Sequence, residues 1–285
     1  MIRKAEIDPV HPVHPVKKMN SLGPSQLGDF MSDAAITHWP TFAQAFTGLR
    51  VGRCAWHGSM LLSERTLEHV CHRPSLIVFD AEDDVATLAR AAAALATLDR
   101  EKFPVMLGLV EPEFTRTLPA LVQSRTAALG LSRVDVLCMK VQDTAELKAG
   151  GSLHALLQLR ERGVIGNLGL AHEDVRQAEW LAINMATRVL CLPYSLENQA
   201  ADHRAIKTAE ESGMTCVALR PTPVSDERAL RFALGRCERV LPVLDAALPE
   251  SVTPMDEAEL ETCWQEYATS HAPPAPLPRS RPPEE

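Results

Sequence analysis

The sequence predicts an α/β fold, a (β/α)8 (TIM) barrel with shortened βα loops and extended N- and C-terminal arms. Short runs of apolar residues, many of them β-branched, recur between longer helical patterns. These runs are nearly continuous rather than alternating, which is typical of parallel strands buried on both faces. A chain of 285 residues with 46% hydrophobic residues fits one such barrel and its core.

Eight candidate strands follow one another along the chain. They span residues 50–56, 75–80, 104–110, 134–141, 164–171, 188–194, 215–221 and 239–245. Parallel neighbours need a crossover connection, and each interval between two of these runs is long enough to hold one. Eight strand-then-helix units therefore predict a closed parallel sheet inside a ring of helices.

The intervals carry helix signals. The segment after the second strand is rich in Ala and Leu and begins with Asp83 or Asp84 as a candidate N-cap. Three later helical patterns end on Gly130, Gly163 and Gly213, and glycine is the usual residue where a helix terminates in the left-handed conformation.

The chain ends flank the barrel with segments of different composition. We expect an N-terminal extension at 1–45, the barrel at 46–250, a helix at 251–270 and a Pro-rich tail at 271–285. In the expected C-terminal helix, Thr253 would be the N-cap and Pro254 the first helical residue. Proline excludes regular helix in the tail, and the N-terminal extension contains the Pro-rich run HPVHPV. We therefore expect both arms to be extended, either free in solvent or laid along a partner.

Composition narrows the functional classes. The formal charge of −8 gives no reason to expect nucleic acid or an anionic membrane as partner, and no apolar stretch is long enough for a membrane span. The seven cysteines include no CxxC pair, so we expect free thiols, no metal site and a reducing compartment. The N-terminus lacks the apolar core of a secretory signal, which leaves the mitochondrial matrix and the cytosol open.

Six segments resemble aldo-keto reductases in their order along residues 49–250. They are SLIVFDAEDD, LGLSRVDVLCMKVQD, LLQLRERGVIGNLGLAHED, LPYSLEN, AEESGMTCVALRP and ALRFALGRCERVLPVLDAALPES. The resemblance implies a barrel whose site lies at the carboxyl ends of the strands. It also supplies a set of positions at which the chemistry of that family can be checked.

The resemblance implies an aspartate, a tyrosine, a lysine and a histidine as reductase residues. The aspartate is retained as Asp80, but the tyrosine falls on Val85 and the lysine on Gly108 or Leu109. The histidine falls on Lys140. Valine cannot donate the proton that general acid catalysis requires, so no catalytic residues of the reductase type are expected.

The cofactor positions implied by the resemblance are also changed. Those that would hold nicotinamide fall on Ala171, His172, Leu192 and Leu219. No Lys or Arg occurs at 240–278, where NADP-using members hold the 2′-phosphate. Only about seven residues separate the seventh strand from the next helix, whereas the family has a long loop there that folds over the cofactor. No cofactor is therefore expected. His172 could still bind a ligand, or cap or precede the next helix.

Lys140 is the most informative replacement. At a barrel strand end it could be desolvated and form a Schiff base, or it could pair with Asp80, Asp135 or Asp143. The favoured hypothesis is a non-catalytic barrel that acts as an accessory or regulatory subunit of a larger protein assembly, reached through the terminal arms. The alternatives are a divergent NAD(P)-dependent oxidoreductase and a Schiff-base enzyme using Lys140.

Overall fold

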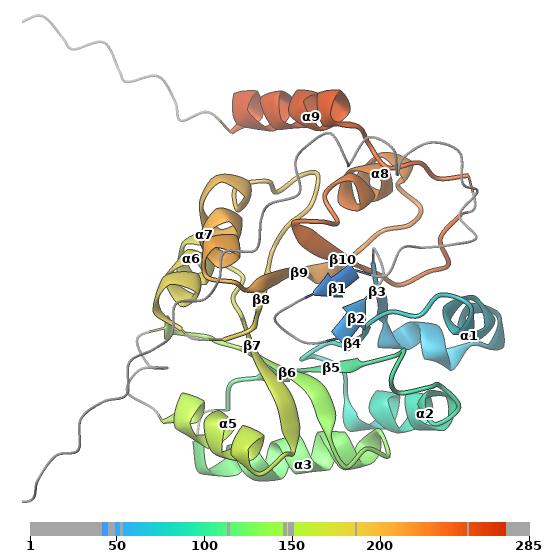
Figure 1. The fold of residues 1–285 in the computed structure, drawn as a ribbon, viewed down its shortest axis with the longest axis vertical. Helices are drawn as coiled ribbons and strands as arrows, with labels where there is room; N and C mark the ends of the chain where they lie inside the picture. The colour runs from blue at the N-terminus through green and yellow to red at the C-terminus, as the bar shows by residue number, and fades with distance from the viewer. Residues whose placement is uncertain are drawn as a thin grey trace, which may run out of the picture. The chain divides into compact units, whose positions relative to one another are not determined.

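The computed structural model describes residues 42–44, 49–51, 54–112, 115–144, 147, 151–185, 187–249 and 251–271. Within these, eight parallel strands close into a barrel in the order β10-β3-β4-β5-β6-β7-β8-β9, with helices around it (Figure 1). The predicted (β/α)8 fold is therefore confirmed. The extension at 1–45 and the tail at 271–285 lie almost wholly outside the described residues, and the roles given to them stay predictions.

The barrel strands fall within or next to the predicted apolar runs. They are β3 (Ala55–His57), β4 (Ile77–Phe79), β5 (Val105–Val110), β6 (Val134–Lys140), β7 (Ile165–Ala171), β8 (Val189–Leu192), β9 (Thr215–Thr222) and β10 (Val240–Leu244).

The first predicted strand, 50–56, is wrong in its extent. Residues Leu49–Val51 form β2, which pairs antiparallel with β1 (Phe42–Gln44) and not with the barrel. The barrel strand begins only at Ala55, and β3 pairs with β10 on one side and β4 on the other. The run 50–56 contains residues of both elements, so its continuity in sequence concealed the break between them.

The α-helices of the outer layer are α1 (Glu64–Cys71), α2 (Val85–Leu95), α3 (Leu118–Ala128), α5 (Ser152–Glu161), α6 (Val175–Asn184), α7 (Lys207–Glu211), α8 (Glu227–Gly235) and α9 (Glu257–Ser270). Short 3-10 turns η3 (Gly58–Leu62) and η4 (Thr115–Thr117) and a π turn η5 (Asp202–Ile206) connect them. The Asp84 side chain accepts a hydrogen bond from Thr87 N and caps α2, as predicted. Gly130, Gly163 and Gly213 have φ of 68–74°, which suits the helix ends where they lie.

The core has two layers. Inward-facing side chains fill the barrel itself, among them Val78, Met106, Cys138, Cys191 and Val243. A larger set lies between the barrel and its helices, and its fully buried members include Trp56, Phe79, Leu107 and Leu137. Alternation along each strand assigns its residues to one layer or the other, which is why the strand sequences are apolar throughout.

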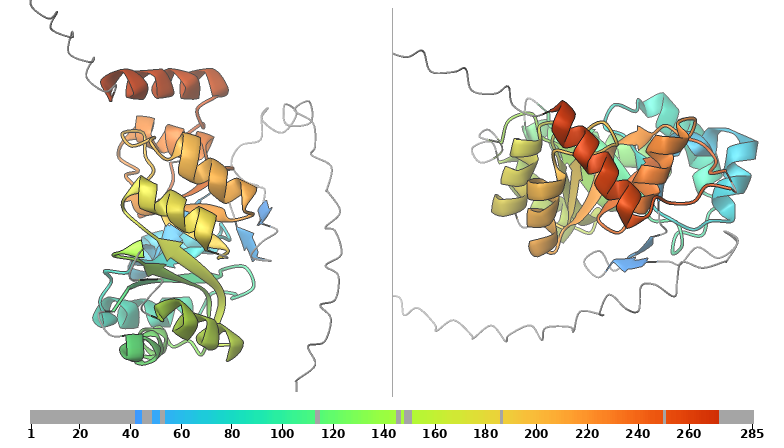
Figure 2. Two further views of the ribbon diagram at one scale, coloured as in Figure 1. Left: turned by 90° about the vertical axis from the view of Figure 1, so that its left-hand side faces the viewer. Right: turned by 90° about the horizontal axis from the view of Figure 1, so that it is seen from above.

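Helix α9 runs along the outside of the barrel, next to α8 (Figures 1 and 2). Its N-cap is Asp256, which forms a capping box with Glu259, so the predicted N-cap Thr253 is wrong. The carboxylate is the stronger cap because its oxygen accepts from Glu259 N while the Glu259 side chain accepts from Asp256 N. Phe232 of α8 packs with Leu260 and Cys263 of α9.

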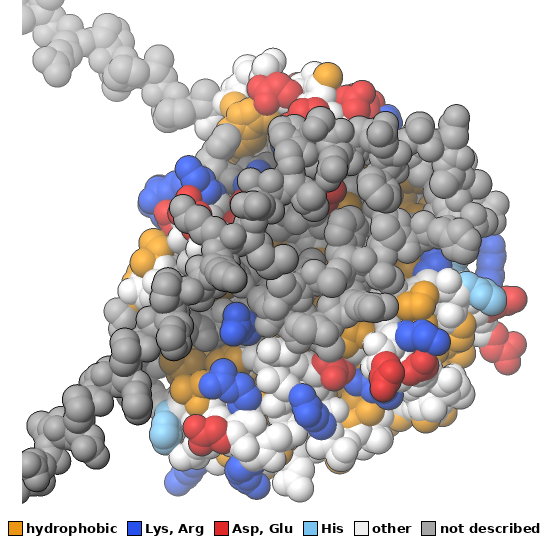
Figure 3. Space-filling view, in the orientation of Figure 1, with side chains coloured by type: hydrophobic (Ala, Val, Ile, Leu, Met, Phe, Trp, Pro, Cys, Tyr) orange, Lys and Arg blue, Asp and Glu red, His pale blue; other side chains and the backbone are white. Residues whose placement is uncertain are grey.

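The described surface mixes charges of both signs. On the face drawn in Figure 3, Lys and Arg side chains alternate with Asp and Glu side chains over the described residues. Among the same residues, none of the helices is long and apolar enough to cross a membrane.

Candidate functional site

A cavity of about 290 Å³ opens at the carboxyl ends of the barrel strands, the end where barrels of this class hold their sites. We call it the mouth pocket. It is lined by Val78, Phe79, Asp80, Ala81, Glu82, Met106, Gly108, Cys138, Lys140, Ala171, Glu173, Cys191, Ala218, Leu219 and Arg220. Its floor is apolar and sulfur-containing, and its charged residues come from the segments that end or follow the strands.

Four of these charged side chains form a chain of ion pairs across the rim. Lys140 Nζ lies 2.5 Å from Glu82 Oε1 and 2.8 Å from Glu173 Oε1. Arg220 Nη2 lies 2.7 Å from Glu173 Oε2. We call Glu82, Lys140, Glu173 and Arg220 the rim network. Two positive and two negative charges alternate along it, so it presents no net charge to a ligand.

Lys140 is held as an ammonium by this arrangement. Hydrogen bonds to Glu173 and Glu82 raise its pKa, and they outweigh the opposing effect of partial burial. The hydrogen bond from Lys140 in turn lowers the pKa of Glu173. A Schiff-base lysine needs the opposite shift, toward a neutral amine, so the geometry argues against that hypothesis. The predicted partners Asp80, Asp135 and Asp143 are wrong, because the longer glutamates at 82 and 173 reach Nζ instead.

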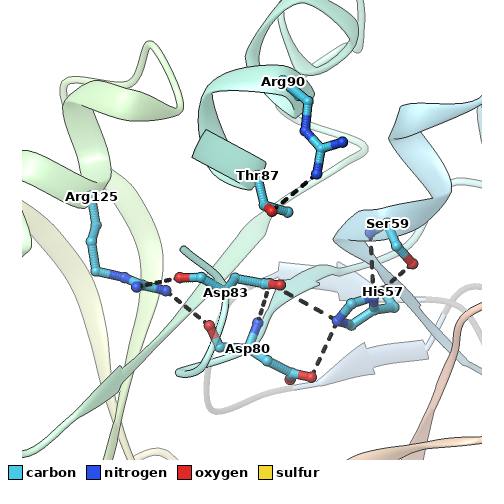
Figure 4. A network of polar contacts seen from close by, with 7 residues as sticks. All are labelled: His57, Ser59, Asp80, Asp83, Thr87, Arg90 and Arg125. Atoms are coloured by element: carbon cyan, nitrogen blue, oxygen red, sulfur yellow. Dashed lines mark hydrogen bonds and ion pairs between the residues drawn. The ribbon is translucent and has the colours of Figure 1, made fainter. Parts of the chain in front are cut away.

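Asp80 belongs to a second cluster with His57, Asp83 and Arg125, which we call the β4-end network (Figure 4). His57 Nε2 lies 3.1 Å from Asp80 Oδ2 and 3.9 Å from Asp83 Oδ2. On the ring's other side, Nδ1 accepts from Ser59 N at 3.3 Å and lies 2.7 Å from Ser59 Oγ. Both ring nitrogens are thus engaged within the protein.

The backbone after β4 is fixed by the same cluster. Asp80 N donates to Asp83 Oδ2 at 2.8 Å, and Asp83 N donates to Asp80 O at 3.3 Å. Arg125, only 6% exposed, reaches over from α3 and donates to Asp83 O at 2.6 Å and to Asp80 O at 2.9 Å. These bonds hold the segment between β4 and α2 in one tight turn.

Titration in the β4-end network reflects burial and mutual charge. Burial disfavours the His57 imidazolium, but the hydrogen bond and charge of Asp80, with the charges of Asp83 and Asp245, raise its pKa overall. Burial raises the pKa of Asp83, and burial lowers the pKa of Arg125. The carboxylates around the ring thus raise the pKa of His57, while an Nδ1 that accepts from Ser59 N leaves the proton of the neutral ring on Nε2, toward Asp80.

The positions expected for the reductase tyrosine and lysine cannot place a reactive side chain in the mouth pocket. Val85 is the first residue of α2, 48% exposed, and it is not part of the pocket lining. Leu109 is buried in the layer between barrel and helices. Gly108 does line the pocket, but a Cβ built there would lie 2.4 Å from Ala81 N and 2.7 Å from Asp80 C.

The positions expected for the nicotinamide cofactor divide in two. Ala171 and Leu219 line the mouth pocket, whereas Leu192 is buried at the end of β8 among apolar side chains. His172 accepts a hydrogen bond from Asp174 N, and Asp174 is the N-cap of α6. His172 thus lies in the turn before α6, as one of the two hypotheses for it predicted.

Sequence reasoning missed His57 because the first strand was predicted to end at Trp56. The residue directly after a predicted strand end is where a barrel site residue is expected, and that signal could have found it. No group of three or more His, Cys, Asp and Glu side chains able to hold a metal ion occurs within the described ranges.

No protein-family model and no curated protein matches the chain. Solved structures of aldo-keto reductases match it in fold. A holo aldo-keto reductase from Bacillus halodurans has a TM-score of 0.64 at 12% identity, over 80% of this chain and 96% of that one. One from Klebsiella pneumoniae in complex with NADPH has a TM-score of 0.62 at 13% identity, over 86% and 98%. The chain therefore has the barrel fold of the aldo-keto reductases.

Proposed function

We propose that this chain is a degenerate member of the aldo-keto reductase family that does not reduce carbonyl compounds and serves as an accessory or regulatory subunit of a protein assembly. Carbonyl reduction of this kind needs a proton donor beside the pocket and a cation that tunes it. Val85 supplies no proton and faces outward, and the two cations at the rim are bound to carboxylates.

The packing at Gly108 carries the proposal. The family's lysine would have to extend from this position or from Leu109. Backbone atoms of Asp80 and Ala81 occupy the space where a side chain at 108 would begin, and the turn they belong to is fixed by Arg125. The backbone after β4 therefore fills the space that a lysine side chain at position 108 would need. We expect no single substitution to restore that space.

The segment expected to hold a nucleotide phosphate supports the same reading. Residues 245–257 carry Asp245, Asp256 and Glu257 without a Lys or Arg. The nearby Arg231 donates to Glu259 and to Thr253 O. A phosphate dianion at this place would meet acidic groups, and its desolvation would go uncompensated.

The first experiment measures NADH and NADPH binding to the purified full chain by calorimetry, together with reduction of a panel of aldehydes. We expect no saturable binding and no turnover, in the native chain and in the Val85→Tyr variant alike. Turnover in Val85→Tyr would contradict the packing argument, since it would show that one restored proton donor is sufficient.

The subunit role needs a separate measurement, the native size of the endogenous protein with mass spectrometry of co-migrating chains. Stoichiometric partners in a large species would support the proposal. Migration as a free species of about the chain's own mass, 31.2 kDa, would contradict it. Deletion of 1–40 or of 272–285 then tests whether the arms hold the partner, and retained assembly with both deletions would count against them.

The second candidate is a divergent NAD(P)-dependent oxidoreductase, and the comparisons favour it over the subunit role. The solved neighbours include aldo-keto reductases in complex with NADP and with NADPH. Asp80 is retained, and His57 is its neighbour at 3.1 Å. Saturable NADPH binding that Ala171→Trp removes and that Ile183→Arg, an exposed position outside the pocket, leaves unchanged would support a cofactor in the mouth pocket and overturn the first proposal.

A further inference from the structure

Two thiols meet on the floor of the mouth pocket. Cys138 Sγ of β6 and Cys191 Sγ of β8 lie 3.2 Å apart, and both side chains line the cavity. Both residues are less than 5% exposed and belong to the set that fills the barrel interior. They are 53 positions apart in the chain, so only the strand order brings them together.

The strand between them leaves room for this contact. Cys138 is level with Gly169 of β7, and Cys191 is level with Ala171 two residues further along the same strand. A Cβ added at Gly169 would lie 3.3 Å from Cys138 Sγ and 3.1 Å from Val189 Cβ. The glycine thus allows the Cys138 side chain to reach across β7 toward its partner.

A direct disulfide does not fit this placement. Neighbouring strands are about 4.8 Å apart, and the curvature of a narrow barrel shortens two such steps to roughly 8 Å between Cα atoms. A disulfide needs Cα atoms within about 7 Å of each other. The strands are fixed on both sides by the closed ladder, and closing that difference would require breaking it. A bridging atom between the sulfurs requires no such movement.

We propose that Cys138 and Cys191 form a two-sulfur site for a soft, thiophilic cation, with Cu(I) as the fitting class. Bonds of about 2.3 Å from one ion to two thiolates place the sulfurs roughly 4 Å apart, which small rotations of two side chains provide. Met106 lines the same cavity and offers a thioether, the other soft donor that selects Cu(I).

The donor set excludes the commoner alternatives. A structural zinc site needs four ligands, and the described residues hold no group of three or more of the usual donors. Hard cations need oxygen ligands, and the carboxylates of the rim are engaged by Lys140 and Arg220. The cation that fits is therefore one that accepts a low coordination number and prefers soft sulfur ligands.

Binding has a definite proton balance. The hydrogen bond from Cys138 and burial hold the pKa of Cys191 well above its usual range, and Cys138 carries the proton that it donates in that contact. Two Cys–SH and one Cu⁺ give a bis-thiolate complex of charge −1 and two released protons, with no change of oxidation state. Lys140 lines the same cavity and offers an ammonium near that negative charge.

The test is an anaerobic titration of the reduced full chain with Cu(I) against a chromogenic Cu(I) chelator. It uses a Cys71→Ser background, because Cys71 is the exposed cysteine in the described part of the chain. We expect one Cu(I) per chain, with an apparent affinity that rises about 100-fold per pH unit below neutrality, since two protons leave. Cys138→Ser and Cys191→Ser should each lower the affinity at least tenfold.

The matched controls are Cys54→Ser and Cys237→Ser, two buried thiols outside the mouth pocket, which should leave the affinity unchanged. Circular dichroism checks that each variant folds. No retained copper, or copper retained in a folded Cys138→Ser/Cys191→Ser double variant, would overturn the proposal. A Cys138–Cys191 disulfide found by peptide mapping after mild oxidation would overturn the geometric argument.

Discussion

Two charged networks lie side by side at the mouth of this barrel, and they are built differently. The β4-end network uses backbone groups as well as side chains, and its arginine is almost fully buried. The rim network joins side chains only, and its members Glu82 and Arg220 are 62% and 75% exposed. The first fixes the course of the chain, whereas the second covers an opening.

We expect the two networks to have different roles, one in the stability of the fold and one in access to the mouth pocket. Buried donors leave unsatisfied carbonyls when they are removed, so the β4-end network should dominate the folding energetics of this end of the barrel. Exposed ion pairs contribute little to stability because water and salt screen them. The rim network should instead decide what enters the mouth pocket. Variants in each network test this division.

The largest effect is expected for Gly108→Ala. The added Cβ would lie 2.4 Å from Ala81 N, a backbone atom that the β4-end network holds in place. We expect a loss of about 3 kcal/mol in the free energy of unfolding, measured by urea denaturation. Gly163→Ala is the control, because its Cβ meets nothing within 4 Å and only φ of 74° is unfavourable. It should cost about 1 kcal/mol, and equal losses would contradict the steric argument.

Arg125→Met tests the network's central donor. It keeps most of the apolar stem but removes both hydrogen bonds to Asp80 O and Asp83 O. The expected loss is about 2 kcal/mol, because Asp83 O loses its Arg125 donor and Asp80 O keeps only the bond from Asp83 N at 3.3 Å. Arg90→Met, whose guanidinium donates to the exposed Thr87 Oγ1, should change stability by less than about 0.5 kcal/mol. If Arg125→Met left the free energy of unfolding unchanged, Arg125 would not be the residue that fixes this turn.

The fold was predictable because apolar runs and glycine helix ends carry local signals. The strand ends of β5 to β9 lie within two residues of the predicted ones. The start of β3 was not predictable, since residues 50–56 look continuous although the chain leaves the β1–β2 hairpin between Val51 and Ala55. A break in pairing that leaves no mark on hydrophobicity cannot be read from a single sequence.

The site was predictable by position but not by contact. Family spacing located Asp80 and Val85 after the end of β4, Gly108 inside β5 and Lys140 at the end of β6. It could not assign Lys140 its partners, because these depend on side-chain reach: Asp135 lies at the opposite end of β6 and pairs with Arg100. The Cys138–Cys191 contact depends on β6 and β8 lying on either side of β7, which only the closed topology establishes.

His57→Gln should reveal the β4-end network through pH. Because the pKa of His57 is raised in the folded state, its stabilisation is fully present below the unfolded pKa of about 6.5 and is lost as pH rises through the folded value. The native chain should therefore gain stability over His57→Gln as pH falls toward 6, with a difference of about 1 kcal/mol at the acidic end. His154→Gln, an exposed control, should show no such trend. A difference that grows toward alkaline pH would show that His57 is held neutral.

Lys140→Met should have the smallest effect on stability and the largest on the pocket. The rim pairs are partly exposed, so the loss should stay below about 1 kcal/mol. The pKa of Glu173 is lowered chiefly by Lys140, so the pair's contribution is present above the unfolded pKa and disappears as pH falls through the folded one. In Lys140→Met the pKa of Glu173 should rise toward its ordinary value, followed by carboxyl NMR, whereas Lys102→Met should leave it unchanged. An unmoved Glu173 would mean that Arg220 alone holds the carboxylate, and the rim would then be two separate ion pairs.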